Sequence, residues 1–211
     1  VYKRQGMNEE NSHYILEPKE VFKTPEFAMT YSMNGKGGVS RTFHRWARQY
    51  KMNQGNRPHD ILLNSWEGVY FKVNQKGMDE MMAAFSAMGG ELFVMDDGWF
   101  GNRRSDRSGL GDWIVNKKLL PNGIEGLAER IEELGMQFGL WIEPEMINKD
   151  SNLYRQHPDW ILQTPGRTES HGRYQYVLDF SRREIVDYIY TMIAKILSGA
   201  KISYIKWDMN R

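Results

Sequence analysis

The chain has 211 residues, enough to bury the core of one or two domains. Its 28 Lys and Arg residues nearly balance its 27 Asp and Glu residues, so no overall basic field indicates a nucleic-acid partner. No apolar run approaches the roughly 20 residues of a transmembrane helix. The sequence contains no cysteine, which excludes disulfide and thiolate chemistry within these residues. We therefore expect neither a nucleic-acid nor a membrane partner.

Residues 1–52 are predicted to be the tail of a β-rich domain followed by a linker helix. Two strand-like runs, 13–22 and 26–33, are followed by a Gly-rich turn at 35–38. Apolar residues then recur at helical spacing as far as Tyr50. The polar, Gly- and Pro-containing segment NQGNRPH that follows is taken as a domain boundary.

From residue 53 to residue 211 the pattern is one of repeated strand–helix units. The predicted strands are 61–66, 91–95, 138–142 and 202–208. The intervening helices are marked by apolar stripes, whose members are Met78, Met81, Met82, Phe85 and Met88, then Ile124, Leu127, Ile131 and Leu134, then Ile185, Ile189, Met192, Ile193 and Ile196. A capping box at 181–184 is expected to begin the last helix.

Four alternating units imply a parallel sheet, and a doubly wound sheet or half of an eight-stranded barrel fits this order equally well. Two features favour the barrel. The first strand is not followed by the Gly-x-Gly-x-x-Gly turn of dinucleotide-binding folds. Charged or aromatic residues also follow every strand, where barrel enzymes place their active sites. The predicted fold is therefore α/β, the first half (strands one to four) of a (β/α)8 barrel, and the other strands are expected beyond Arg211.

The predicted strand ends deliver carboxylates, indoles and cations to one rim. Side chains alternate along a strand, so Lys206, Asp208 and Asn210 are expected on one face. Each group has a simpler interpretation: paired Asp residues often cap helices or bind metals, and Trp is commonly core. His residues with metal-ligand spacing and Gly-rich phosphate loops are both missing from the sequence. Several carboxylates with indoles and cations suit a polyol, and two carboxyl groups can cleave a glycosidic bond.

A series of motifs carries a specific resemblance. They are NSWEGVYF (64–71), ELFVMDDGWFGNR (91–103), GLGDW (109–113), FGLWIEPEM (138–146), HPDWIL (157–162), YVLDFS (176–181) and IKWDMNR (205–211). In this order and spacing they resemble glycoside hydrolase family 36, the retaining α-galactosidases of bacteria and fungi. The stretch TPEFAMTY (24–31) resembles the join between that family's N-terminal β-sandwich and its barrel.

The resemblance implies a role for each of several residues. Asp208 matches the nucleophile that forms a covalent galactosyl intermediate, which requires an ionised carboxylate. Asp96 and Asp97 match the carboxylates that bind the axial O4 and the O6 of galactose. The other matched positions bind galactose hydroxyls, line the subsite or reach it from a loop, and they are Lys206, Asn210, Trp66, Trp141 and Arg173.

The resembled family uses a second carboxyl group, an Asp on a later strand, as its general acid/base. This sequence ends before that strand, so no acid/base is assigned, and Glu143 is set aside as a substitute. Residues 1–211 alone are therefore expected to be inactive. Neither a metal ion nor a cofactor is predicted.

Several alternatives remain open at this point. A raffinose-type transglycosylase or an α-N-acetylgalactosaminidase would share the nucleophile, and a non-catalytic sugar-binding protein would share the rim. A barrel enzyme that acts on other substrates is disfavoured because metal and phosphate signals are lacking. The sequence does not choose among melibiose, raffinose and branched galactomannan as the substrate, and homo-oligomers are implied only by the resemblance.

The first residues carry a separate signal. Residues 1–5 lack an initiator Met and resemble a translated sequencing adapter, the alternative being a genuine internal segment. Under both interpretations the natural N-terminus is expected to lie elsewhere. The predicted location is cytoplasmic.

Overall fold

The structure, a computed structural model, describes residues 15–24 and 26–210. The chain divides into two compact units, Val1–Pro58 and His59–Arg211. The division falls inside the polar segment that the sequence analysis took as a boundary.

The described part of the first unit contains one regular element, helix α1 (Gly35–Tyr50). The Gly-rich stretch at 35–38 was predicted as a turn, but it forms the first turn of this helix. The strand-like runs are also wrong, because residues 15–24 and 26–33 form no strand. A strand is stable only beside a hydrogen-bonded partner, and the described residues of this unit offer none. The beginning of the first run, residues 13 and 14, lies outside the described residues.

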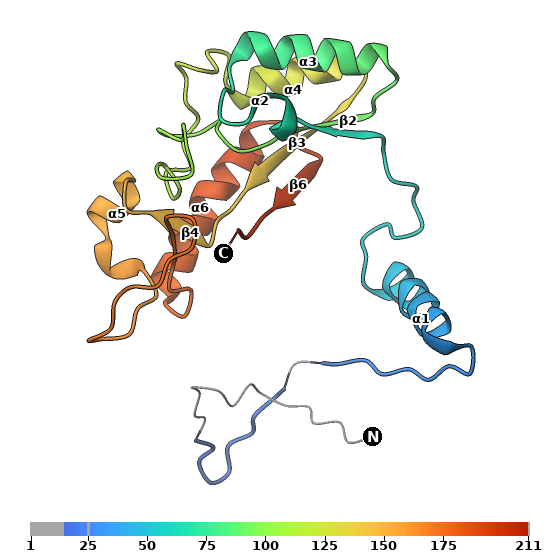
Figure 1. Cartoon of the computed structure of the whole chain (residues 1–211), viewed down its shortest axis with the longest axis vertical. Coiled ribbons are helices and arrows are strands. Elements are labelled where there is room, and N and C mark those ends of the chain that lie inside the picture. Colours follow the sequence, from blue (N-terminus) through green and yellow to red (C-terminus); the bar gives the residue numbers. More distant parts are fainter. Residues whose placement is uncertain (1–14, 25, 211) are drawn as a thin grey trace. The chain divides into compact units, whose positions relative to one another are not determined.

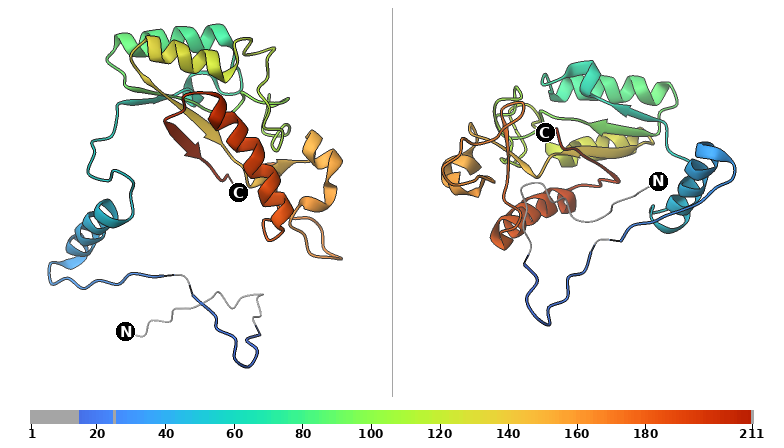
Figure 2. Two further views of the ribbon diagram at one scale, coloured as in Figure 1. Left: turned by 180° about the vertical axis from the view of Figure 1, so that it is seen from behind. Right: turned by 60° about the horizontal axis from the view of Figure 1, so that its bottom comes forward.

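The second unit is built on a parallel sheet, as predicted. Its strands are β1 (Leu62–Asn64), β2 (Leu92–Met95), β3 (Gln137–Ile142) and β6 (Tyr204–Trp207), in that spatial order. Figures 1 and 2 show β2, β3 and β6 running side by side, with the carboxyl ends of all three at the same edge. Gly139 lies opposite Val94 and Tyr204, where an added Cβ would come within 2.9 Å of the Val94 side chain. The absence of a side chain at this position lets the three strands approach.

The helices between the strands cover the sheet with the predicted apolar faces. Helix α4 (Gly123–Glu133) packs against β3 and contacts both α3 (Gln75–Ala87) and α6 (Arg183–Gly199) (Figure 1). The buried members of the three stripes are Met78, Met82, Phe85, Ile124, Leu127, Ile131, Ile185, Ile189 and Ile193. Across the described residues, we find no helix with the length and apolarity to span a membrane.

One predicted helix signal is wrong. The Ser181 hydroxyl donates to Asp179 Oδ1 at 2.6 Å instead of capping α6, and Glu184 accepts from Arg182 Nε at 2.7 Å. The N-cap residue is Arg182, which makes no side-chain capping bond. Two nearby charged partners therefore replace the reciprocal bonds of a capping box.

Two long loops depart from the simple strand–helix repeat and fold over the carboxyl edge of the sheet. The loop after β3 contains a two-stranded antiparallel sheet of β4 (Met146–Asn148) and β5 (Gln175–Val177), the helix α5 (Asn152–Gln156) and the 3-10 turn η1 (Pro158–Trp160). The loop after β2 buries aromatic rings against Trp141 of β3. Phe100 stacks on Trp141 at 6.2 Å between ring centroids and contacts Trp113 at 4.5 Å. These loops are thus part of the core.

The packing of α3 predicts the effect of two matched substitutions. Met82 is fully buried, whereas Met88, which follows the helix, is 75% exposed although it was predicted to face inward. Met82→Ala should lower the free energy of unfolding by about 2–5 kcal/mol because it leaves a cavity. Met88→Ala should change it by less than about 0.5 kcal/mol. Urea titrations of the two variants measure the difference, and equal effects would contradict the packing described.

Candidate active site

A pocket of about 160 Å³ opens at the carboxyl edge of the sheet. Its lining comprises Trp66, Asp96, Asp97, Arg103, Trp141, Arg173, Gln175, Lys206, Asp208 and Asn210. Every residue that the sequence analysis placed in the site is among them. Arg103 and Gln175 were not predicted. The pocket is therefore built from the ends of β2, β3 and β6, from the short helix α2 (Trp66–Val69) after β1, and from the two long loops.

The position of Asp208 follows from the pairing of β6 with β3. Trp141 lies opposite Lys206 in this pair, and the Asp208 backbone N–H donates to the Ile142 carbonyl at 2.9 Å. Side-chain alternation then brings Lys206, Asp208 and Asn210 to the same pocket, as predicted.

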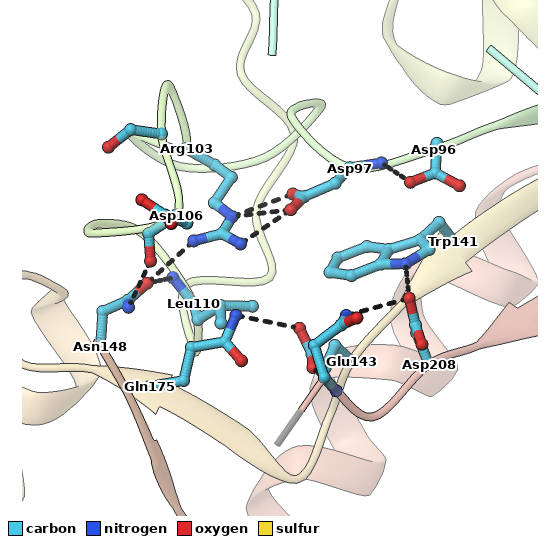
Figure 3. Close-up of polar contacts among 12 residues, drawn as sticks. Asp96, Asp97, Arg103, Asp106, Leu110, Trp141, Glu143, Asn148, Gln175 and Asp208 are labelled. Carbon is cyan, nitrogen blue, oxygen red and sulfur yellow. Dashed lines mark hydrogen bonds and ion pairs between the residues drawn. The ribbon is translucent and has the colours of Figure 1, made fainter. Parts of the chain in front are cut away.

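The Asp208 carboxylate is held by three donors. Its Oδ2 accepts from Trp141 Nε1 at 3.0 Å (Figure 3). The same oxygen accepts from Asn210 Nδ2 at 3.0 Å, and Oδ1 accepts from the Met209 backbone N–H at 2.9 Å. Burial raises the pKa of Asp208, whereas these hydrogen bonds and the charge of Lys206 lower it. The net pKa of Asp208 lies below its ordinary value of 3.8, so the carboxylate is ionised at neutral pH.

Asp96 connects three strands at the base of the pocket. It is 3% exposed, and its Oδ2 accepts from Asn64 Nδ2 at 2.6 Å and from Lys206 Nζ at 2.8 Å. Its Oδ1 accepts from the Asp97 backbone N–H at 2.9 Å. Asn64 belongs to β1 and Lys206 to β6, so this one carboxylate links the two outer strands of the sheet through the end of β2.

Asp97 forms a buried ion pair with Arg103. Arg103 Nε donates to Oδ1 at 2.9 Å and Nη2 donates to Oδ2 at 2.7 Å, a bidentate contact visible in Figure 3. Both residues are at most 5% exposed. Burial raises the pKa of Asp97 above its ordinary value, and Arg103 opposes that rise. Gly98, at φ +107°, permits the turn that brings the two side chains together.

The guanidinium of Arg103 also reaches Asn148 of β4. Arg103 Nη1 donates to Asn148 Oδ1 at 3.1 Å, and the same oxygen accepts from the Leu110 backbone N–H. The amide group of Asn148 donates to the backbone carbonyl of Asp106 (Figure 3). It also donates to the backbone carbonyl of Tyr174. The buried pair and Asn148 together fix both long loops around the pocket.

The rim of the pocket, formed by Arg173 and Trp66, is more exposed than the buried carboxylates and Arg103. Arg173 is an exposed side chain on the loop before β5 and has a left-handed backbone conformation, with φ +49°. Trp66 begins α2, and its ring contacts Phe71 edge-on at 5.0 Å between centroids.

Among the described residues, no group of three or more His, Cys, Asp or Glu side chains is arranged to hold a metal ion.

A fully buried glutamate lies behind the pocket lining. Glu143 follows β3 directly, and its Oε1 accepts from the Asn210 backbone N–H at 2.6 Å. Its Oε2 accepts from Gln175 Nε2 at 3.4 Å (Figure 3). Burial raises the pKa of Glu143 and the nearby Asp208 charge raises it further, whereas the bonds from Asn210 and the charge of Arg103 lower it. The net pKa of Glu143 lies above its ordinary value.

Comparison with known proteins identifies the family. The melibiase family model matches residues 21–211. The chain belongs to the melibiase family. α-Galactosidase AgaA of Geobacillus stearothermophilus is 48% identical over 209 residues, which are 98% of this chain and 28% of AgaA. α-Galactosidase Mel36A of Lactobacillus acidophilus is 43% identical over 213 residues, 100% of this chain and 29% of Mel36A.

The solved structures of this family agree with the fold. A crystal structure of a family 36 AgaA variant in complex with raffinose superposes with a TM-score of 0.80 and 49% identity over 82% of this chain and 24% of AgaA. The resemblance to family 36 α-galactosidases is thereby confirmed, as is the mixed α/β fold with its parallel sheet. The chain spans less than a third of the length of the relatives that it matches.

The sequence analysis missed two residues of the pocket, Arg103 and Gln175. They differ in how far the sequence could have indicated them. Arg103 is the last residue of the motif that contains Asp96 and Asp97, and a cation so close to paired carboxylates could have been suspected as their partner. Gln175 follows a polar loop and carries no charge. Only the pairing of Asn148 with Gln175 in the antiparallel sheet places it at the pocket, so sequence spacing alone gave no indication of its role.

Removing the cation of the buried pair should destabilise the fold in a pH-dependent way. Arg103→Met leaves Asp97 buried without its partner, which typically costs about 3–5 kcal/mol of unfolding free energy. The pKa of Asp97 rises further in the variant, so folding takes up a proton at acid pH and the cost grows as pH increases above 3.8. Urea unfolding at pH 4 and pH 7 should show the larger loss at pH 7.

The exposed Arg130, paired with Glu133 at 2.9 Å, is the matched control for that experiment. Arg130→Met should have little effect at either pH, because exposed ion pairs contribute little to stability. Equal losses for Arg103→Met at the two pH values would contradict the proposed dependence on Asp97.

Proposed function

We propose that this chain is part of a retaining α-galactosidase in which Asp208 is the nucleophile. The observation that carries the proposal is the Asp208 carboxylate held by hydrogen-bond donors from Trp141, Asn210 and the backbone in the lining of a polar pocket. In this mechanism Asp208 attacks the anomeric carbon of an α-galactoside, the glycosidic bond breaks, and a covalent β-galactosyl ester forms. Water then releases galactose with its α configuration.

We further propose that the parallel sheet is the first half of a (β/α)8 barrel. The order of the strands, the helices between them and the pocket at the carboxyl edge support this. A retaining mechanism needs a second carboxyl group roughly 5–5.5 Å from the nucleophile. Asp96 and Asp97 already bind Lys206 and Arg103. The proposal therefore places the acid/base outside these residues, in the complete protein.

The same pocket offers a basis for galactose specificity. We propose that Asp96 and Asp97 accept hydrogen bonds from O4 and O6, because each carboxylate oxygen can accept more than one donor. The equatorial O4 of a glucoside would not reach the carboxylate that accepts the axial O4, and the loss of that hydrogen bond disfavours binding. Lys206 and Asn210 would donate to other hydroxyls, Trp66 and Trp141 would form walls, and Arg173 would close the rim.

The proposed substrates are oligosaccharides that end in an α-galactosyl residue. The support comes from AgaA, which is named an α-galactosidase and has been crystallised as a variant with raffinose. The uncharged, hydroxyl-rich surface of such a sugar suits a pocket lined by carboxylates, cations and indoles.

The nucleophile is tested with the complete protein and an aryl α-galactoside. Asp208→Asn should lower kcat by about a thousandfold or more, because the neutral amide cannot form the galactosyl ester. NMR of the first product of the unmodified protein should show α-galactose. Asp208→Gly with added azide should give β-galactosyl azide, since azide then attacks from the face that the carboxylate occupied.

Glu145→Gln is the matched control, because Glu145 follows β3 but binds Trp207 Nε1 at 3.0 Å outside the pocket lining. This variant should retain its activity. Hydrolysis that survives Asp208→Asn would place the nucleophile elsewhere. An intact protein that transfers galactose to sugars in preference to water would be a transglycosylase, and one that only binds sugars would contradict the enzymatic proposal.

The pKa of Asp208 gives a second test. Because this pKa lies below 3.8, the acid limb that Asp208 contributes to kcat/KM is expected below that pH. Trp141→Phe keeps a ring beside Phe100 but removes the indole donor, so the pKa of Asp208 should rise and the limb should move to higher pH. Trp207→Phe removes an indole that binds Glu145 and should leave the limb unmoved. A limb that stays in place in Trp141→Phe would contradict this role.

A further inference from the structure

The burial of the Glu143 carboxylate is energetically unfavourable and requires a structural explanation. Its exposed fraction is 0%, and an isolated buried charge is costly unless hydrogen bonds compensate it. Its oxygens accept from the Asn210 backbone N–H at 2.6 Å and from the Gln175 amide at 3.4 Å, and the Asn210 side chain also interacts with the carboxylate. An apolar residue would avoid the cost of burial, but it would leave the Asn210 N–H without this acceptor.

The backbone near Glu143 explains why a side chain, and not a backbone carbonyl, accepts the Asn210 N–H. The pairing of β6 with β3 reaches the Asp208 N–H, which donates to the Ile142 carbonyl. Pro144 has no N–H, so the chain after β3 cannot continue the donor pattern of a parallel ladder. The next N–H group that points back from β6, that of Asn210, is instead bound by the Glu143 carboxylate. This side-chain contact extends the attachment of the β6 end beyond the regular sheet.

That attachment bears directly on the proposed nucleophile. Asn210 Nδ2 donates to Asp208 Oδ2 at 3.0 Å, and the Trp141 indole donates to the same oxygen. Trp141 is held by β3 and by stacking on Phe100. Asn210 lies beyond the last residue of β6, and its backbone N–H donates to Glu143.

We propose that Glu143 is a positioning residue, which through Asn210 sets the orientation of the Asp208 carboxylate. This inference rests on the proposed function of Asp208. Glu143 does not line the pocket, and its proposed role involves no proton transfer. Its task is to accept the Asn210 N–H, and Gln175 supports it from β5. The Gln175 Oε1 is buried and has no hydrogen-bond partner, so its amide can turn over without losing a bond at that oxygen.

A positioning role and a proton-transfer role for Glu143 predict different kcat values for two variants of the complete protein. Glu143→Met has no acceptor, so Asn210 should move and kcat should fall about tenfold to a hundredfold, with a smaller effect on KM. Glu143→Gln keeps an acceptor for the Asn210 N–H, and a turned Gln175 amide can accept from the new amide group. Its kcat should lie within about threefold of the unmodified value. A proton-transferring carboxyl would instead be disabled equally by both substitutions.

A double-mutant cycle separates positioning from a merely structural role. Asn210→Ala keeps the backbone N–H but removes the side chain that donates to Asp208 and also interacts with Glu143. Glu143→Met should therefore add little further loss of kcat in that background. Full additivity of the two losses would overturn the proposal, as would a Glu143→Met variant with nearly unchanged kcat. Glu145→Gln serves again as the control carboxylate. If Glu143→Met does not fold, Glu143→Asp, whose carboxylate is withdrawn by one methylene, should show the same selective loss of kcat.

Crystal structures of the unmodified protein and the same variants give a readout that does not need activity. The contact between Asn210 Nδ2 and Asp208 Oδ2 should be lost in Glu143→Met and kept in Glu143→Gln. An unmoved Asn210 in Glu143→Met would overturn the positioning role. A protein that shows the expected displacement but hydrolyses no α-galactoside would refute the proposed function while leaving the structural link from Glu143 to Asp208 in place.

Discussion

The register between β3 and β6 is the constraint on which the pocket depends. Opposite Trp141 stands Lys206, and this pairing puts the Trp141 indole within 3.0 Å of Asp208 and the Lys206 ammonium within 2.8 Å of Asp96. A slip of one residue would turn Lys206 and Asp208 to the opposite face of the sheet. The close approach of the strands at Gly139 and the helices packed behind them oppose such a slip. The chemistry of the pocket is therefore secured by apolar packing that lies away from it.

The carboxylates near the pocket are the same functional group in different surroundings. Asp208 accepts three hydrogen bonds, and the result is a lowered pKa. Asp97 and Glu143 are more deeply buried, and the pKa of each is raised although cations or amides bind them. This divergence separates a carboxylate that remains ionised at neutral pH from carboxylates that burial makes harder to ionise. Neighbouring carboxylates can thus serve different purposes within one small volume.

The sequence predicted the parts of this protein that depend on local pattern. The four strands, the apolar stripes of α3, α4 and α6 and the face shared by Lys206, Asp208 and Asn210 follow from periodicity. The family motifs added Arg173, whose place on the pocket rim no spacing rule indicates. The barrel itself and the roles of the site residues remain predictions.

The features that were missed depend on contacts between distant segments. Arg103 reaches Asn148 across 45 positions, and Gln175 reaches Glu143 across 32, through an antiparallel sheet that the strand–helix pattern did not contain. The predicted capping box at Ser181 failed for a local reason, because Ser181 binds Asp179 and Glu184 binds Arg182 instead. Strand-like runs before residue 34 failed because the described residues give them nothing to pair with.

The pocket lining has a consequence for how ligands arrive. Its ionisable side chains are three carboxylates and three cations, namely Asp96, Asp97, Asp208, Arg103, Arg173 and Lys206. Within this chain the lining therefore has equal numbers of acidic and basic side chains, and neither sign is in excess to attract an ion. Encounter with an uncharged solute should then proceed by plain diffusion and be nearly indifferent to ionic strength. An anionic solute would lose hydration on entry, and the lining in this chain has no excess of cations to offset that loss.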